Sequence, residues 1–309
     1  MIFVKFTIKE KGIFKIMGNK SAFIAIIGVP NVGKSSLLNA LLGQKISIVS
    51  TKPQTTRNRI MGILTQAETQ LVFIDTPGLH KPKNKLGEKM IREIKEATLD
   101  VDCAVLVVEP RAPGKTETEL IERFKKENIP VILVINKTDI TKKDIVAKTI
   151  SEYSDIFDFT AVVPLSALRK DNVDPLIDEI IKTVSGDVAF YPDDISTDRT
   201  ERQLAAEILR EKLIRRLSDE IPYGINVEIV SFKERENKPI IDISANIICE
   251  KASHKGIIIG KNGETLKTAA TLARQEAEKL LGKKVFLECF VKVREDWRND
   301  EKYISEYEQ

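Results

Sequence analysis

Cysteine and histidine are scarce in this chain. Only three cysteines (Cys103, Cys249 and Cys289) and two histidines occur among 309 residues, and the cysteines lie far apart with no C-x-x-C spacing. This scarcity argues against a disulfide framework and against a Cys/His zinc site. We expect the cysteines to be small buried apolar residues of a protein in a reducing compartment.

Long apolar runs are also missing. No apolar stretch approaches the roughly 18 residues that cross a bilayer. Residues 1–20 alternate apolar residues with lysine and glutamate and lack a small-residue cleavage site, so they are not expected to be a secretory signal. Met17 is an alternative start to Met1, and we expect residues 1–20 to be an N-terminal extension.

Neither sign of charge is in large excess. The formal net charge is +3, so nucleic acid would have to bind a local basic patch and not the protein as a whole. The composition, 42% hydrophobic and 31% charged, is that of an ordinary globular protein. The length suits roughly two domains.

Residues 22–185 alternate apolar runs with helical patterns, which predicts an α/β domain: a mostly parallel sheet with helices on both faces. The expected strands are Phe23–Ile27, Leu71–Ile74, Cys103–Val108, Val131–Ile135 and Ala161–Val163. The expected helices include Ser35–Leu42, Lys85–Leu99, Glu117–Glu127 and Pro175–Val184. Such sheets bind ligands beyond the carboxyl ends of their strands.

A second unit follows a break in this pattern. The Gly-, Pro- and Asp-containing stretch 186–199 reads as a linker whose Phe190 and Tyr191 dock on a neighbouring domain. Beyond it we expect a helix (200–218), two strands (226–232 and 240–249), a helix–turn–helix region (255–281) and a strand (285–293), an α+β unit. The predicted domains are therefore 21–185 and 200–309, the latter including a C-terminal tail.

The segment Gly28-Val-Pro-Asn-Val-Gly33-Lys34-Ser35 fits the phosphate-binding pattern G-x-x-x-x-G-K-[ST], between an expected strand and an expected helix. Its backbone N–H groups can converge on phosphates at a helix N-terminus. Lys34 can reach the β- and γ-phosphates, and the Ser35 hydroxyl can ligate Mg²⁺. The alternative is an accidental glycine-rich turn. The predicted nucleotide-binding residues here are Asn31, Val32, Gly33, Lys34, Ser35 and Ser36.

Two further segments fit a γ-phosphate sensor. In Asp75-Thr-Pro-Gly78, Asp75 can hold Mg²⁺ through water and the Gly78 N–H can contact the γ-phosphate, although the same tetrapeptide also makes a plain turn. In Thr51-Lys-Pro-Gln-Thr-Thr-Arg57 a threonine can ligate Mg²⁺ while the γ-phosphate is present and release it after hydrolysis. Thr56 is preferred over Thr55, and a polar loop without a ligand is the alternative. Lys34, Thr56 and Gly78 are the predicted catalytic residues.

Asn136-Lys137-Thr138-Asp139 predicts guanine selection. The Asp139 carboxylate can accept hydrogen bonds from N1 and N2 of guanine, whereas adenine has no donors there and would leave the carboxylate unpaired. Lys137 can lie over the base, Asn136 can brace the loop, and the Ala167 N–H of Ser166-Ala167-Leu168 can meet guanine O6. The alternatives are a solvated turn and an ATP-using P-loop enzyme.

The C-terminal unit carries the pattern of a type II KH domain, an RNA-binding fold. An apolar helix end leads into the G-x-x-G loop Gly260-Lys261-Asn262-Gly263 and a second helix. Four lysines and one glutamate between Lys251 and Lys267 form a local positive patch, and apolar residues beside it can receive splayed bases. A glycine at an ordinary helix–turn–helix junction is the alternative. The predicted RNA-binding residues are Lys255, Ile257, Ile258, Ile259, Gly260, Lys261, Asn262, Gly263 and Lys267.

With these ordered motifs, the Gln-Thr-Thr-Arg57 segment and the Pro-Asn pair inside the P-loop, the chain resembles the Era group of translation-factor-related GTPases (TrmE-Era-EngA-like P-loop GTPases). The G-x-x-G loop and Tyr191-Pro-Asp-Asp of the linker sharpen the resemblance to the KH-domain GTPase of that group. The resemblance covers about residues 20–300. It implies a GTPase using GTP/GDP and Mg²⁺ that binds the 3′ end of small-subunit ribosomal RNA and acts in 30S subunit maturation.

The resemblance also carries finer expectations. Ras-type GTPases place a water-orienting glutamine where Leu79 stands here, which implies slow intrinsic hydrolysis. Similar Pro-Asn P-loops imply K⁺ beside the phosphates, held here by Asn31. A cytoplasmic monomer is expected, with peripheral contact at the inner membrane face left open. The rival hypothesis is a constitutive RNA-binding protein whose nucleotide only stabilises the fold.

Overall fold

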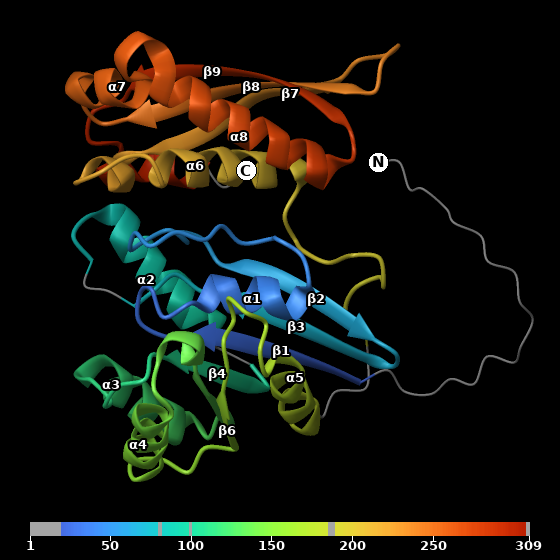
Figure 1. The fold of residues 1–309 in the computed structure, drawn as a ribbon, viewed down its shortest axis with the longest axis vertical. Coiled ribbons are helices and arrows are strands. Elements are labelled where there is room, and N and C mark those ends of the chain that lie inside the picture. Colours follow the sequence, from blue (N-terminus) through green and yellow to red (C-terminus); the bar gives the residue numbers. More distant parts are fainter. Residues whose placement is uncertain (1–19, 80–81, 99–100, 185–188, 307–309) are drawn as a thin grey trace, which may run out of the picture.

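Two separate sheets organise the chain in a computed structural model that describes residues 20–79, 82–98, 101–184 and 189–306 (Figure 1). The first sheet has six strands in the order β2-β3-β1-β4-β5-β6, and the second has three in the order β7-β8-β9. The expected N-terminal extension lies almost wholly outside the described residues.

The first sheet is parallel except for its edge strand β2, which pairs antiparallel with β3. Its strands are β1 (Lys20–Ile27), β2 (Ile60–Gln66), β3 (Thr69–Asp75), β4 (Cys103–Val108), β5 (Val131–Ile135) and β6 (Ala161–Pro164). All of β4 is buried, because a central parallel strand is covered on both faces. Ile26 of β1 is paired with Asp75 of β3, so the loops that follow these two strands leave the sheet at the same edge.

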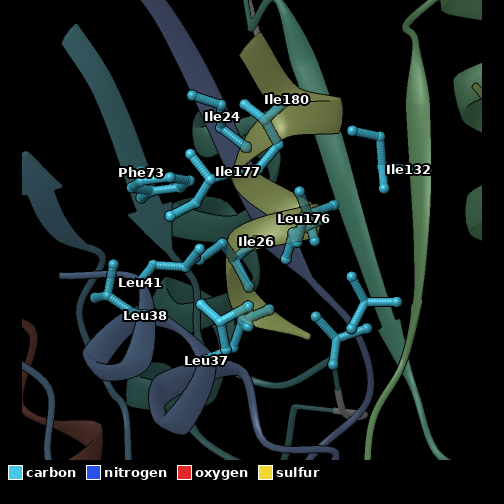
Figure 2. Packing of buried hydrophobic residues seen from close by; sticks show 14 of the residues in the cluster. Ile24, Ile26, Leu37, Leu38, Leu41, Phe73, Ile132, Leu176, Ile177 and Ile180 are labelled. Atoms are coloured by element: carbon cyan, nitrogen blue, oxygen red, sulfur yellow. The ribbon is translucent and has the colours of Figure 1, made fainter. Parts of the chain in front are cut away.

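Helices cover both faces of this sheet. They are α1 (Lys34–Leu42), α2 (Lys85–Ala97), α3 (Lys115–Glu127), α4 (Lys143–Ser154) and α5 (Val173–Lys182), with a short 3₁₀ helix at Thr138–Ile140. Alternate residues of β1 serve the two faces: Ile24 and Ile26 pack with α1 and α5, whereas Ala25 and Ile27 pack with α3 and α4. Figure 2 shows the first of these cores, in which Leu37, Leu38 and Leu41 of α1 are buried together with Leu176, Ile177 and Ile180 of α5.

The second unit is an α+β fold. It comprises α6 (Glu201–Ile214), β7 (Asn226–Glu234), β8 (Ile240–Cys249), α7 (Ala252–Ile259), α8 (Glu264–Leu281), β9 (Lys284–Val293) and α9 (Glu301–Glu306), with 3₁₀ turns at Ile221–Gly224, Lys261–Gly263 and Trp297–Asn299. Strand β8 pairs antiparallel with β7 and parallel with β9, the parallel connection running through α7 and α8. One buried cluster joins α6, α8 and the sheet.

Helix α6 lies between the second sheet and the first unit (Figure 1). Its start is fixed by a capping box, in which Thr200 and Gln203 satisfy each other's backbone N–H groups. The same junction holds a mixed apolar cluster: Leu86 and Met90 of α2 pack with Ile248, Trp297, Tyr303 and Ile304 of the second unit. The two units therefore share an interface as well as a linker.

The linker docks on the first sheet, as predicted from Phe190 and Tyr191. The Phe190 and Phe23 rings lie 4.6 Å apart, and Gln70 Oε1 accepts hydrogen bonds from the backbone N–H groups of Phe190 and Tyr191, each at 2.9 Å. Farther along the linker, the Ser196 carbonyl accepts a hydrogen bond at 2.9 Å from the N–H of Ile63 in the edge strand β2. The linker thus covers part of an edge that would otherwise expose backbone groups.

The fold class is confirmed, and the predicted strands are found with shifts of a few residues at most. The sequence reading missed β2, whose antiparallel edge position needs no long apolar run, and α4, whose polar surface hides its helical period. Helix α6 ends at Ile214, before the expected Ser218. Leu99, the expected end of α2, lies outside the described residues. Cys103 and Cys249 are buried as expected, whereas Cys289 is only half-buried.

Candidate functional site

A cavity of about 690 Å³ opens at the edge of the first sheet where β1, β3 and β5 end. A smaller cavity of about 330 Å³ lies between the two units. Most of the residues predicted to bind the nucleotide line the larger one: Asn31, Gly33, Lys34, Ser35, Ser36, Thr56, Gly78, Asn136, Lys137, Asp139 and Leu168. Five segments that are distant in sequence thus meet at one place.

The phosphate-binding loop wraps around the Lys34 side chain. Its Nζ donates to the carbonyl oxygens of Gly28 and Val29, each at 3.0 Å. Burial lowers the pKa of Lys34 to about 8, with the nearby Asp75 carboxylate opposing that shift. Gly33 has a φ of 100°, and a Cβ there would collide with the Asn136 amide. A glycine is therefore required at the point where the loop passes the base-binding segment.

Three oxygen-bearing side chains converge beside the loop. Ser35 Oγ lies 2.8 Å from Thr56 Oγ1 and donates to Asp75 Oδ2 at 2.7 Å. Asp75 Oδ1 is buried and has no hydrogen-bond partner among the described residues. Hydroxyl and carboxylate oxygens are the ligands that Mg²⁺ prefers, directly or through water, so these residues fit a magnesium site. Thr55 Oγ1 instead donates to the Lys52 carbonyl, which leaves Thr56 as the threonine whose hydroxyl lies beside Ser35.

Ser47 is a site residue that the sequence reading missed. It is fully buried, and its Oγ donates to Asp75 Oδ2 at 3.0 Å. Asn39 of α1 holds it in place: Asn39 Oδ1 accepts from the N–H groups of Ile46 and Ser47, and Nδ2 donates to the Ser47 carbonyl. Burial raises the pKa of Asp75, whereas Lys34, Ser35 and Ser47 oppose that rise. A serine between two isoleucines carries no sequence signal of this role.

The Asp75-Thr-Pro-Gly78 segment lies directly against the phosphate-binding loop. A Cβ on Gly78 would come within 2.8 Å of Pro30 Cα, so a larger residue would push the two segments apart. The next residue, Leu79, donates its N–H to the Gly28 carbonyl at 3.4 Å, and its side chain packs on the core beneath α3 and α4. Leu79 therefore cannot orient an attacking water.

Asn136 braces the base-binding corner, as predicted. It is 3% exposed, its Nδ2 donates to the Val32 carbonyl at 2.8 Å, and its Oδ1 accepts from the Ala167 N–H at 3.0 Å. Asp139 stands exposed at the mouth, where Ser166 Oγ donates to its Oδ1 at 2.7 Å. Ile140 and Leu168, 78% and 79% exposed, offer apolar surface beside it. This corner can hold a flat polar base.

Two residues of this corner have protein partners that the motifs did not predict. The Ala167 N–H, assigned to guanine O6 from the sequence, is directed at Asn136 because that buried amide oxygen needs a donor. Lys137 also has an unforeseen partner: its ammonium forms an ion pair with Glu109, which follows β4. Neither partner could be read from the motifs, because both depend on how neighbouring strands align.

The predicted RNA-binding segment is an exposed basic surface on the second unit. Lys251, Lys255, Lys261 and Lys267 are all exposed, and within the described chain none of them forms an ion pair. Gly260, Asn262 and Gly263 have positive φ values and form a sharp turn between α7 and α8. Ile257 is 52% exposed at the end of α7.

Ile258 was predicted wrongly as an RNA-binding residue. Its side chain is 0% exposed, and it packs in the core formed by α6, α8 and the second sheet. Ile259 is partly buried against the same core. In a helix, successive residues point in directions about 100° apart, so three consecutive isoleucines cannot all face solvent. The sequence reading treated them as one apolar surface.

The second unit contacts the segment that carries Thr56. Glu211 Oε1 of α6 accepts from the Val49 N–H at 3.1 Å, and Arg215 donates to the Val49 carbonyl at 2.8 Å. Arg210 of α6 donates to the Thr55 carbonyl. The residues at 49–56 therefore face the cavity on one side and α6 on the other.

Within the described residues, no helix combines the length and apolar character needed to cross a bilayer.

A phosphate-binding loop, a corner that can hold a flat polar base and a three-stranded α+β unit with a G-x-x-G turn define a P-loop GTPase joined to a KH domain. Comparisons with known families agree: the model for 50S ribosome-binding GTPases matches residues 23–137, and the KH domain model matches residues 220–298. The chain is 49% identical over 288 residues to GTPase Era of Clostridium kluyveri, covering 93% of this chain and 98% of that protein. It belongs to the GTPase Era family.

Other relatives give the same result. GTPase Era of Ruminiclostridium cellulolyticum is 48% identical over 290 residues, or 94% of this chain and 97% of that protein. The solved structure of Era in complex with MgGDPNP and nucleotides 1506–1542 of 16S ribosomal RNA matches with a TM-score of 0.89 at 39% identity, covering 93% of this chain and 98% of that chain. A variant of Aquifex aeolicus Era bound to GDP·AlF₄⁻ matches with the same score and identity. Membership in a GTPase family favours guanine over the ATP alternative.

Proposed function

We propose that this GTPase is a nucleotide-controlled RNA holder that binds the 3′ end of small-subunit ribosomal RNA during 30S subunit assembly. The protein bound to GTP and Mg²⁺ and the protein bound to GDP are two states that differ in RNA affinity. One observation carries the proposal: residues 49–56 contact both the nucleotide cavity and α6 of the KH domain. A change at the γ-phosphate therefore has a direct route to the RNA-binding unit. The related Era in complex with MgGDPNP and 16S ribosomal RNA supports the same pairing of ligands.

The nucleotide roles follow from the geometry of the cavity. Lys34 and the backbone N–H groups from Asn31 to Ser36 bind the phosphates, and the Gly78 N–H contacts the γ-phosphate. Ser35, Thr56 and Asp75 hold Mg²⁺, which would neutralise charge on the phosphates. Asn136, Lys137, Asp139, Ser166, Ala167 and Leu168 form the guanine corner. In that corner Asp139 selects the base, while Ser166 fixes the orientation of its carboxylate.

Hydrolysis by this chain is slow without help. The side chain that follows Gly78 is Leu79, which is packed on the core and cannot polarise water. What remains is positioning and charge: Lys34, the Gly78 N–H and the oxygen ligands stabilise the transferring phosphoryl group. Slow hydrolysis gives a long-lived GTP state, which suits a checkpoint.

We expect Asn31 to bind a monovalent cation beside the nucleotide. This residue is exposed at the lip of the cavity, with a φ of 67°, and its Nδ2 donates to the Thr51 carbonyl at 3.1 Å. We propose that its side-chain oxygen helps hold K⁺ beside the β- and γ-phosphates. Hydrolysis should then be faster in K⁺ than in Na⁺ at equal ionic strength. Equal rates in the two salts would remove this part of the proposal.

The RNA-binding surface is the G-x-x-G turn with the lysines around it. Lys255, Lys261 and Lys267 contact phosphates, Gly260 and Gly263 let the backbone approach the strand, and Ile257 packs against a base. Because the four exposed lysines from Lys251 to Lys267 lack ion-pair partners in the described chain, their charge is available to RNA.

The test is RNA affinity in each nucleotide state. A labelled oligonucleotide with the 3′-terminal sequence of 16S RNA is titrated with the full chain loaded with a non-hydrolysable GTP analogue or with GDP. Tighter binding in one state, lost on Lys261→Glu but kept in the distant surface control Lys148→Glu, supports the switch. Equal affinity in both states would instead establish the constitutive RNA-binding protein with a structural nucleotide.

The organisation of the chain is part of the proposal. We assign residues 21–185 to the GTPase domain, 186–199 to the linker and 200–309 to the KH domain with its tail, after an N-terminal extension of residues 1–20. The protein acts as a monomer in the cytoplasm, where ribosomal subunits assemble. Peripheral contact with the inner membrane face stays a prediction.

A further inference from the structure

Arg210 is a fully buried charge at the junction of the two domains. It lies on α6 of the KH domain, is 0% exposed, and donates from Nη2 to the backbone carbonyl of Thr55 in the GTPase domain. Thr55 is followed directly by Thr56, whose Oγ1 lies 2.8 Å from Ser35 Oγ. A guanidinium of the RNA-binding domain therefore holds the peptide unit that presents a candidate magnesium ligand.

Glu207, one helical turn earlier on α6, fixes the orientation of this guanidinium. Arg210 Nε donates to Glu207 Oε1 at 2.8 Å, and Nη2 donates to Oε2 at 2.6 Å. Burial alone would raise the pKa of Glu207, but the charge and hydrogen bonds of Arg210, with Arg57 and Arg199 nearby, hold it below its ordinary value. A bidentate pair of this kind orients the arginine as well as compensating its charge.

The segment is also fixed at its other end. Asn39 clamps Ile46 and Ser47 to α1, whereas the residues from Ser50 to Thr56, apart from Pro53, line the nucleotide cavity. Between the clamp and Thr56, the backbone is contacted by α6 at Val49 and Thr55. The position of the Thr56 hydroxyl thus depends on where α6 sits.

We propose that Arg210 is a positioning residue for the GTP state: by holding the Thr55 carbonyl, it places the Thr56 hydroxyl beside Ser35 and so completes the magnesium site. The KH domain thereby contributes to nucleotide selection by its neighbour, and RNA that shifts α6 changes the preference for GTP over GDP. This inference rests on the proposed role of Thr56. Arg210 does not line the nucleotide cavity, so its effect reaches the site only through the backbone.

The experiment compares binding of a fluorescent non-hydrolysable GTP analogue and of fluorescent GDP to full-length variants, over a range of Mg²⁺ concentrations. In Arg210→Met we expect about tenfold weaker analogue binding, about the weight of one charge-assisted hydrogen bond, with a higher Mg²⁺ requirement and nearly unchanged GDP binding. Arg210→Lys should recover part of the loss, because an ammonium can still donate to the carbonyl. A merely structural arginine would weaken both nucleotides alike or neither.

Arg202→Met is the matched control. Arg202 also lies on α6 and donates from Nη2 to a backbone carbonyl, but that carbonyl belongs to Ile229 in its own domain. The control should keep the parent ratio of analogue to GDP affinity. If Arg210→Met does not fold, as judged by thermal unfolding with GDP bound, Glu207→Gln provides the test. This variant keeps Arg210 but weakens the hydrogen bonds that orient its guanidinium. It should shift the ratio of analogue to GDP affinity in the same direction by a smaller factor.

Thr56→Ala separates the two levels of the proposal. If Thr56→Ala leaves analogue binding and its Mg²⁺ dependence unchanged, the magnesium assignment is wrong. If Thr56→Ala weakens the analogue but Arg210→Met and Glu207→Gln leave the ratio at the parent value, the positioning role of Arg210 is overturned while the proposed function stands.

Discussion

The guanidinium carbon of Arg57 lies 5.4 Å from the centre of the Trp297 ring. The two residues come from the two domains, and both are almost fully buried. Arg57 also donates to the carbonyl oxygens of Ile225 at 2.6 Å and Tyr223 at 3.0 Å, and Trp297 Nε1 donates to the Gly224 carbonyl at 3.0 Å. The arginine that ends the Gln-Thr-Thr-Arg segment is therefore an anchor of the domain interface.

Trp297 should matter for stability and not for stacking on a base. Trp297→Ala is expected to lower the free energy of unfolding by about 3 kcal/mol, because it empties a large buried site shared by both domains. Circular dichroism during denaturant unfolding measures this, since Trp297 is the only tryptophan of the chain. Unchanged stability together with weaker RNA binding would contradict the buried role.

Asp139→Asn should change which purine is bound. An amide at this position turns one acceptor into a donor, so GTP affinity should fall about 100-fold while xanthosine triphosphate gains affinity. Isothermal titration with both nucleotides measures the exchange. Asp155→Asn, at the end of α4 and away from the cavity, is the control. Parent-like GTP affinity in Asp139→Asn would remove the base-selecting role.

Ser47→Ala should raise the Mg²⁺ requirement for GTP binding. The variant loses the hydrogen bond that Ser47 donates to Asp75 Oδ2, so the buried carboxylate is held less firmly. We expect a several-fold higher Mg²⁺ concentration at half-maximal binding, in line with about 1 kcal/mol for one hydrogen bond. The readout is nucleotide fluorescence during a Mg²⁺ titration, with Ser244→Ala on β8 as control. A parent-like midpoint would show that Ser35 alone suffices to orient Asp75.

Glu211 makes the domain interface sensitive to acid. Burial would raise the pKa of Glu211, but hydrogen bonds from Lys45 and Lys212 hold it below the ordinary 4.5. A carboxylate with a lowered pKa stabilises the fold above its unfolded-state pKa and loses that contribution as the pH falls through the folded value. Parent and Glu211→Gln should therefore differ by about 2 kcal/mol at pH 7, and the difference should shrink progressively as the pH falls below about 4.5.

The check on Glu211 is denaturant unfolding of both proteins from pH 7 to pH 3.5. Glu119→Gln is the control, because Glu119 faces Lys115 at 3.8 Å on an exposed helix surface. An exposed pair contributes little, so that variant should follow the parent across the range. A Glu211→Gln difference that stays constant with pH would mean that the carboxylate is not the charged partner.

Gly78→Ala should impair the GTP state more than the GDP state. An added Cβ would come within 2.8 Å of Pro30 Cα, so the segment carrying the Gly78 N–H must move away from the phosphate-binding loop. We expect at least a tenfold slower single-turnover hydrolysis, with GDP affinity within about twofold of the parent, because GDP lacks the phosphate that this N–H contacts. Hydrolysis at the parent rate would show that the loop tolerates the displacement.

The sequence alone determined the class of fold and most of the nucleotide site. The phosphate-binding, Asp75 and Asn136–Asp139 motifs each follow an apolar strand, and parallel strands bring their carboxyl ends to one edge. That local chemistry repeats wherever this nucleotide is bound, so short motifs suffice to find it. The G-x-x-G turn and its lysines were readable for the same reason.

Only the tertiary structure decided which residues connect the two domains. Nothing in the local pattern of Arg210 or Glu211 separates them from the other charged residues of α6, yet both are fully buried against the segment carrying Thr56. The sequence did not predict that Ser47 contacts Asp75 in the nucleotide site. It also did not predict that Ile258 is buried in the core and is therefore absent from the RNA-binding surface. Such roles depend on which face of an element meets which neighbour, and packing between distant parts of the chain sets that choice.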